Sequence, residues 1–214
     1  MKAQQIVDHY TGCLIKHRGD LAKEVDWKDQ DTCDKRNQAF LDNLYHCGMF
    51  PSDSLLDFGM GTGSFYGFSR RQKQLLTQNY SGCDASLAMV EEAKLRYPDI
   101  ADNLFHLPLG KELSSSSDFS ILSGVFTEKR SLSKYEMLYE VVVPTLKMVW
   151  HWTNQALLVN FMNSHSLPLN KQRDELLFLD SNELVNLAKD LGASRYKIVS
   201  NYLEFEHLLV LEKK

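Results

Sequence analysis

The chain has 214 residues, of which 43% are hydrophobic and 24% are charged, and its formal net charge is −4 at pH 7. That length suits one well-buried domain, because domains typically span about 50–200 residues. No apolar run approaches the roughly 18 residues that cross a bilayer. The longest basic cluster, residues 69–73, is too short for a large nucleic-acid footprint. We therefore expect a globular protein that binds a small molecule, a sugar or another protein, with neither a nucleic acid nor a membrane as partner.

The cysteines and the first residues indicate a compartment. The four cysteines form no CxxC pair and have no histidine at zinc-finger spacing, so we expect reduced thiols and no metal site. The segment MKAQQIVDHYTG lacks the continuous apolar core of a secretory signal. The sequence therefore predicts a cytoplasmic protein.

Residues 1–50 predict two or three helices. Polar and charged residues alternate there with apolar positions at helical intervals, such as Ile6, Tyr10 and Leu14. The breaker Pro51-Ser52-Asp53 ends this pattern. We expect residues 1–50 to form a helical cap over a main domain of residues 51–214.

From residue 54 onward, predicted strands alternate with predicted helices. Short segments between turn residues predict strands at 54–58, 79–84, 104–107, 119–126, 156–161, 196–199 and 205–211. Helices are expected after Gly63, after an N-cap at Ser86, over 131–153 with a kink at Pro144, and from a cap at Asp180 or Ser181 to Gly192. This α/β alternation predicts a mostly parallel sheet with helices on both faces. Ligands of such sheets bind at the carboxyl ends of the strands.

The segment LLDFGMGTGSF, residues 55–65, carries Gly59, Gly61 and Gly63 directly after the first predicted strand. Such glycines mark a turn where the backbone takes unusual dihedrals or approaches a ligand closely. Asp84 ends the next strand 21 positions after Gly63, where a carboxylate accepts hydrogen bonds from ribose hydroxyls in nucleotide sites. The GxGxG spacing differs from the GxGxxG that seats a pyrophosphate, and no P-loop motif is present. The arrangement indicates a nucleoside site without a phosphate cradle.

These residues resemble the class I S-adenosylmethionine-dependent methyltransferases. LLDFGMGTGSF is similar to the first motif of that superfamily, and YSGCDASLAMVEEAKLRYP is similar to the second, an acid that ends a strand before a helix. The segment ASRYKIVSNYLEFEHLLVLEKK resembles the terminal β-hairpin of their Rossmann-like sheet, which has seven strands, one of them antiparallel. VDWKDQDTCDKRNQAFLDNL and SGVF are similar to a small bacterial branch of methyltransferases. The resemblance to the superfamily as a whole covers residues from about 52 to 214.

The resemblance implies S-adenosylmethionine as the cofactor. The contacts it implies are Asp57, Gly59, Gly61 and Gly63 beside the methionine part, Asp84 on the ribose hydroxyls, Ala85 and Met89 at the adenine, and Ser123 after the fourth strand. An acid that the superfamily often carries after strand three is missing, because the stretch here is Phe105-His106-Leu107-Pro108. The adenine pocket is thus the part where this chain departs from the pattern.

Methyl transfer needs the lone pair of an acceptor in line with the sulfonium, and a general base only where the nucleophile arrives protonated. The candidates for that base are His9, Tyr10 and His165, and Ser123, Thr127, Asn160 and Asn163 are also expected to face the pocket. An Asn/Asp-Pro-Pro-Tyr/Phe motif is absent after the fourth strand, which removes the usual support for methylation of amino groups in bases or glutamine. The expected acceptor is a small molecule or a glycan precursor.

Two other interpretations stay open. A nucleotide-dependent oxidoreductase would use a related sheet, although the GxGxG spacing and the terminal hairpin disfavour it. A binding protein would keep the cofactor fold without turnover. Single residues also have plain structural uses, because Asp57 can bond backbone amides in a turn and Asp84 can cap a helix.

Overall fold

The computed structural model describes residues 3–72, 79–165 and 173–213. Its strands are β1 (Ser54–Phe58), β2 (Asn79–Asp84), β3 (Leu104–His106), β4 (Ser117–Leu122), β5 (Thr153–Asn163), β6 (Phe178–Leu179), β7 (Arg195–Val199) and β8 (Glu206–Glu212). Its helices are α1 (Gln4–His17), α2 (Gln30–His46), α3 (Ser64–Arg71), α4 (Leu87–Arg96), α5 (Lys134–Glu136), α6 (Val143–His151) and α7 (Ser181–Asp190). Two 3-10 turns, η1 (Lys23–Val25) and η2 (Pro98–Asn103), and a π-helical turn, η3 (Met137–Val142), complete the order.

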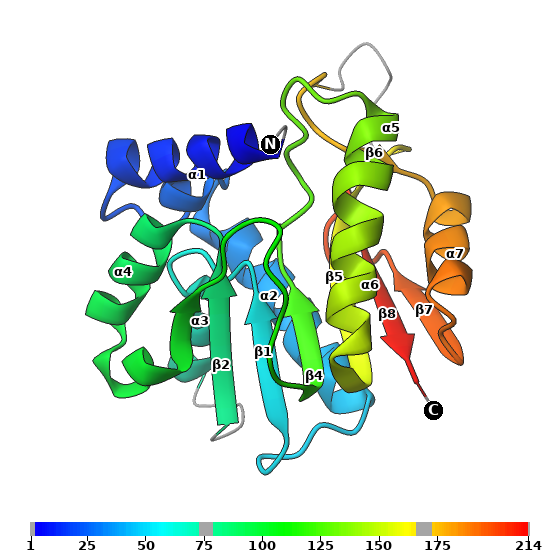
Figure 1. Ribbon diagram of the computed structural model, residues 1–214, viewed down its shortest axis with the longest axis horizontal. Coiled ribbons are helices and arrows are strands. Elements are labelled where there is room, and N and C mark those ends of the chain that lie inside the picture. The colour runs from blue at the N-terminus through cyan, green and yellow to red at the C-terminus, as the bar shows by residue number, and fades with distance from the viewer. Residues whose placement is uncertain (1–2, 73–78, 166–172, 214) are drawn as a thin grey trace.

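The sheet has the strand order β3-β2-β1-β4-β5-β8-β7 (Figure 1). Neighbouring strands from β3 to β5 are parallel, whereas β8 is antiparallel to both β5 and β7. The predicted mostly parallel sheet with one reversed strand is therefore confirmed. The structure adds β6, which pairs in parallel with β5. Two residues are too few to show a strand period, so the sequence does not reveal this strand.

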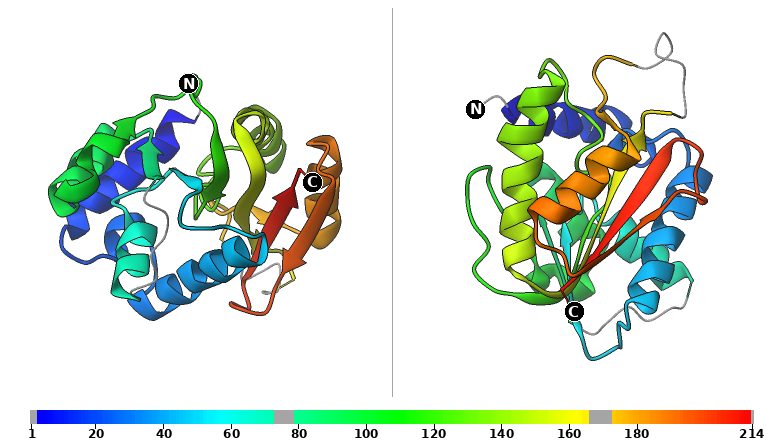
Figure 2. Two further views of the ribbon diagram at one scale, coloured as in Figure 1. Left: turned by 90° about the horizontal axis from the view of Figure 1, so that it is seen from below. Right: turned by 90° about the vertical axis from the view of Figure 1, so that its right-hand side faces the viewer.

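Both faces of the sheet are covered, as the apolar run of β5 requires. Leu157, Val159 and Phe161 pack on one face in a cluster with residues of α6 and α7, while Ala156 and Leu158 pack on the other face with residues of α2, α3 and α4. Figure 2 shows α6 and α7 separated from α2 by the sheet. Each fully buried large apolar side chain contributes about 1.5–3 kcal/mol to the stability of the fold. Because β5 contributes such side chains to both faces of the sheet, it takes part in both hydrophobic clusters.

The two N-terminal helices occupy different places. Phe40, Leu41 and Leu44 of α2 are fully buried in the same cluster as residues of β1 and β4. In contrast, α1 lies across the carboxyl ends of β1 and β2 (Figure 1). The division of the chain into a cap of residues 1–50 and a main domain of residues 51–214 stays a prediction. Within the described part of the chain, no helix is both long and apolar enough to cross a membrane.

The fourth strand ends earlier than its apolar run predicts. β4 stops at Leu122 and not at Phe126, because Gly124 adopts a φ of +78° and turns the chain out of the sheet. The N–H of Gly124 donates to Oδ1 of Asn160 at 2.7 Å, a bond that replaces a strand partner. Residues 123–126 therefore form a loop at the carboxyl end of β4.

The long helix predicted over 131–153 also differs. It begins at Lys134, because Ser133 and Glu136 form a capping box that defines its first turn. Pro144 has no N–H to donate, and the turn before it widens to the π-helical η3, in which Val143 donates to Leu138. The helix thus continues to His151 through a widened turn, a common way to absorb such a disruption.

A buried ion pair joins α2 to β8 across 170 positions of sequence. Nε and Nη2 of Arg36 donate to the two carboxylate oxygens of Glu206 at 3.1 and 2.5 Å, and the hydroxyl of Tyr202 donates to Glu206 at 3.1 Å. The guanidinium lies 3.4 Å from the ring centre of Trp27. Glu206 is 0% exposed, so its charge depends on these partners.

Glu206→Gln should lower the free energy of unfolding by about 3–5 kcal/mol, because it leaves the Arg36 charge buried without its counter-ion. Urea unfolding of the wild type and the variant measures the difference. Asp31→Asn is the matched control, since Asp31 is 74% exposed and pairs with Lys35 one turn away on the helix surface. Equal losses in the two variants would contradict the assignment.

Candidate functional site

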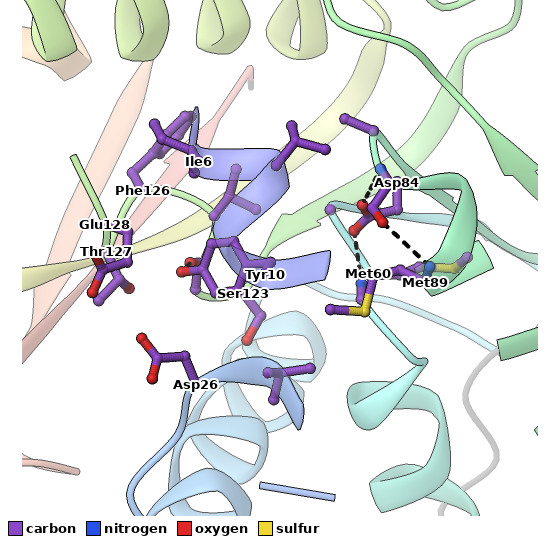
Figure 3. A pocket seen from close by; sticks show the side chains of 18 of the residues that line it. Ile6, Tyr10, Asp26, Met60, Asp84, Met89, Ser123, Phe126, Thr127 and Glu128 are labelled. Atoms are coloured by element: carbon purple, nitrogen blue, oxygen red, sulfur yellow. Dashed lines mark hydrogen bonds between the residues drawn. The ribbon is translucent and has the colours of Figure 1, made fainter. Parts of the chain in front are cut away.

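A cavity of about 580 Å³ lies at the carboxyl ends of the strands, beneath α1 (Figure 3). Pockets that hold small ligands typically measure roughly 300–1,000 Å³. Its walls come from the loop after β1, the end of β2, the loop after β4, α1 and the segment around residues 25–28. The sequence-predicted residues that line it are Tyr10, Gly59, Gly61, Asp84, Ala85, Met89, Ser123 and Thr127.

The glycines of the loop after β1 have different environments. Gly59, Gly61 and Gly63 all adopt positive φ, at 74°, 56° and 82°, a region that side chains rarely enter. A Cβ on Gly59 would lie 2.6 Å from Cγ2 of Val125, and one on Gly63 would lie 2.8 Å from Cε2 of Tyr97. Gly59 and Gly61 line the cavity, whereas Gly63 caps α3 against Tyr97 away from it. The third glycine is thus explained by helix packing.

Asp84 joins the glycine loop to the start of α4. Its Oδ2 accepts from the N–H of Gly61 at 2.9 Å, and its Oδ1 accepts from the N–H of Ser86 at 2.8 Å (Figure 3). Burial raises the pKa of this carboxyl, and the hydrogen bonds from Ser86 and Gly61 oppose that rise. Asp84 also lines the cavity, and a carboxylate oxygen has a second lone pair for a further donor. The group is therefore placed to receive hydroxyls from a bound molecule.

Asp57 lies beneath the loop and outside the cavity lining. It is 1% exposed, and its Oδ2 accepts from the hydroxyl of Tyr80 at 2.8 Å. Its Oδ1 has no partner among the described residues. Burial raises the pKa of Asp57 to about 7, with a further rise from the charge of Asp84 and an opposing effect of the Tyr80 hydrogen bond. Asp57 is expected beside the methionine part of the cofactor, but it does not line the cavity. Its side chain instead contacts Tyr80 of β2.

The three candidates for a general base, His9, Tyr10 and His165, occupy different places in the structure. Tyr10 lines the cavity, and its hydroxyl donates to the carbonyl of Gly124 at 3.4 Å. Burial raises the pKa of Tyr10 above its ordinary value, so this hydroxyl stays protonated and acts as a donor.

Neither candidate histidine lines the cavity formed by the described residues. Nε2 of His9 lies 2.8 Å from Oδ2 of Asp26 and 3.8 Å from Sγ of Cys13, in a hydrogen-bonded cluster that joins α1 to Asp26. His165 is exposed, and its backbone N–H donates to the side chain of Asn163. The expectation that these two histidines face the pocket is therefore not met.

The structure brings further polar residues to the cavity that the sequence analysis does not name. Glu128, Arg36, Asp26 and Trp27 all line it. Glu128 is only 1% exposed, and Arg130 and Arg173 lie 3.2 and 3.5 Å from its carboxylate. A single acid in a loop has no period or spacing that marks it, so sequence reasoning had no signal for Glu128.

No protein-family model and no curated protein sequence matches the chain. Solved structures resemble it over nearly its whole length. The magnesium protoporphyrin IX methyltransferase from Synechocystis, with bound S-adenosylhomocysteine, has a TM-score of 0.71 at 16% identity and covers 99% of this chain and 100% of its own. An S-adenosylmethionine-dependent methyltransferase from Clostridium acetobutylicum has a TM-score of 0.62 at 10% identity and covers 98% of each chain.

The pyocyanin biosynthetic protein PhzM has a TM-score of 0.62 at 14% identity, over 94% of this chain and 61% of its own. These likenesses, with the strand order and the position of the cavity, define the fold. The chain has the Rossmann-like fold of the class I S-adenosylmethionine-dependent methyltransferases.

The raised pKa of Asp57 predicts a pH-dependent stability. With a pKa of about 7 in the folded state and about 3.9 in the unfolded state, the folded protein keeps a proton that the unfolded chain releases. This contribution is full below about pH 4 and is lost as the pH rises to about 7. Relative to Asp57→Asn, which does not titrate, the wild type should lose up to about 1.4 kcal/mol per pH unit in this interval.

Urea unfolding of both proteins at several pH values measures this difference. Tyr80→Phe is a second variant, because it removes the hydrogen bond that lowers the folded-state pKa of Asp57, so the loss of stability should continue to higher pH. Parallel stability curves for the wild type and Asp57→Asn would show that Asp57 titrates as an ordinary acid.

Proposed function

We propose that the chain is a methyltransferase that uses S-adenosylmethionine and methylates a small molecule, such as a metabolite or a glycan precursor. One observation carries the proposal: the Asp84 carboxylate faces a cavity beside the GxGxG loop, at the carboxyl end of β2. The fold is shared with proteins solved with S-adenosylmethionine or S-adenosylhomocysteine bound. Position, fold and loop spacing all support the same cofactor.

The residues around the cavity suit the parts of this cofactor. Asp84 would accept hydrogen bonds from the ribose hydroxyls through the lone pairs that Gly61 and Ser86 leave open. The backbone at Gly59 and Gly61, which carries no side chain, would border the methionine part. The apolar side chains of Met89 and Leu107, with Ala85, would enclose the adenine.

The bound cofactor would supply a methyl group on a positively charged sulfur, which is already electrophilic. The protein's task is then to orient the acceptor and to exclude water. Ile6, Val7 and Tyr10 of α1 line the cavity from above. Tyr10 fixes the loop after β4 through its hydrogen bond to Gly124, so α1 holds the acceptor side of the cavity in place.

S-adenosylhomocysteine should bind with a dissociation constant in the micromolar range, measured by titration calorimetry. Asp84→Ala should weaken this binding by about 1.5–3 kcal/mol, roughly 10- to 150-fold, because it removes charge-assisted hydrogen bonds to the ribose. Asp102→Ala is the matched control, since Asp102 is an exposed acid of η2 outside the cavity lining. Unchanged affinity in Asp84→Ala would contradict the ribose assignment.

Two further measurements separate the alternatives. A fluorescence titration with NADH tests the oxidoreductase, and binding of NADH without binding of S-adenosylhomocysteine would overturn the proposal. Transfer of a labelled methyl group from S-adenosylmethionine to metabolites of a cell extract tests turnover. Binding without transfer would instead favour a protein that keeps the cofactor and lacks the reaction.

A further inference from the structure

A second polar group lies in the cavity, at a distance from Asp84. In Figure 3, Glu128 and Thr127 lie on the side opposite Asp84 and Met89, and Tyr10 lies between them. The segment that carries Glu128 and Thr127 is held by backbone hydrogen bonds to residues 175–177. Leu177 donates to the carbonyl of Thr127 at 2.9 Å, and Lys129 donates to the carbonyl of Glu175 at 2.7 Å. The backbone that carries these two side chains is therefore held in place.

The charge of Glu128 is compensated within the protein. Nη1 of Arg130 lies 3.2 Å from Oε2, and Nη2 of Arg173 lies 3.5 Å from Oε1. These two guanidinium groups neutralise the negative charge of the buried carboxylate. A cationic ligand would therefore gain little at this site. A neutral hydrogen-bond donor is the partner that suits a carboxylate already paired in this way.

The side chain of Thr127 independently indicates a ligand that forms hydrogen bonds at this place. Its Oγ1 is buried and has no hydrogen-bond partner among the described residues, although buried polar atoms are nearly always paired. A hydroxyl both donates and accepts. A ligand hydroxyl can therefore bond Glu128 and Thr127 at the same time, which an ether or a hydrocarbon cannot do.

Aromatic and aliphatic side chains line much of the cavity, among them Trp27, Phe126, Phe205, Val141 and Met162. The charged Asp26 and Arg36 also line it, but they are already paired with His9 and Glu206. Flat apolar walls favour an aromatic ring over a sugar, whose hydroxyls would lose water without gaining partners. The polar pair thus lies in surroundings that suit a ring carrying one hydroxyl.

We propose that Glu128 and Thr127 form the acceptor subsite and that it takes a phenol. The inference rests on the proposed function and deepens it. Glu128 accepts the hydrogen bond of the phenolic O–H and takes its proton as the O–H bond breaks. The new bond joins the phenolic oxygen to the methyl carbon, while the carbon–sulfur bond of the methyl donor breaks and leaves its electron pair on a neutral thioether. Burial supports this role because it raises the pKa of Glu128 above the ordinary value of a glutamate.

The test compares phenol with anisole, its methyl ether, in ligand-observed NMR titrations with and without S-adenosylhomocysteine. The wild type should bind phenol more tightly than anisole. Glu128→Gln should weaken phenol binding about 10-fold or more, because it removes a hydrogen bond to a charged acceptor, and should leave anisole binding unchanged. Glu91→Gln is the matched control on the exposed face of α4 and should behave as the wild type does.

Thr127→Val gives a second variant of nearly the same shape, and it should weaken phenol binding several-fold without changing anisole binding. Equal phenol affinity in the wild type and both variants would overturn the inference. Tighter binding of benzylammonium than of phenol would also overturn it, because the site would then select a cation. Failure of S-adenosylhomocysteine to bind would count against the proposed function alone, since the phenol titration without it still reports on Glu128 and Thr127.

Discussion

The arrangement of the candidate site depends on one carboxylate that receives two backbone N–H groups. Asp84 bonds Gly61 and Ser86, and thereby fixes the loop after β1 against the start of α4. The carbonyl of Cys83 accepts from Gly59 at 2.8 Å and from Met60 at 3.0 Å beside it. The end of β2 thus serves as a template for the glycine loop. The same carboxylate that shapes the cavity keeps lone pairs for a ligand, so architecture and binding are coupled at this residue.

The opposite side of the cavity is supported by a longer-range constraint. Arg36 pairs with Glu206, and a Cβ on Gly124 would lie 2.7 Å from Nη1 of Arg36. The loop after β4 therefore passes directly over a guanidinium that α2 and β8 hold in place. This loop carries Ser123 and leads to Thr127 and Glu128, so the position of the acceptor side depends on α2. The two halves of the cavity are fixed by different parts of the chain, one local and one distant.

Much of the fold could be predicted from the sequence, because β1 is a short apolar run bounded by turn residues and β2 ends at the expected acid, Asp84. Gly59, Gly61 and Asp84 could be placed at one end of the sheet from the sequence, because they follow two strands at a recognisable spacing, and all three line the cavity. Glu128 could not be found in this way, because its burial results from pairing with residues 175–177. Nor could the orientation of His9, which depends on its contact with Asp26 across 17 positions.

The π-helical turn η3 has a consequence for how this segment can change in length. Each residue of an α-helix rotates the following side chains by about 100°, so one additional residue in a widened turn sets the two halves of the helix out of phase. Here Val141 faces the cavity, while Leu146 and Val149 after the turn are buried against the sheet. A deletion of a single residue within 137–142 would restore a regular helix and rotate one of these faces away from its partner. The number of residues in η3 is thus fixed by the need to keep both faces of the helix in contact with their partners.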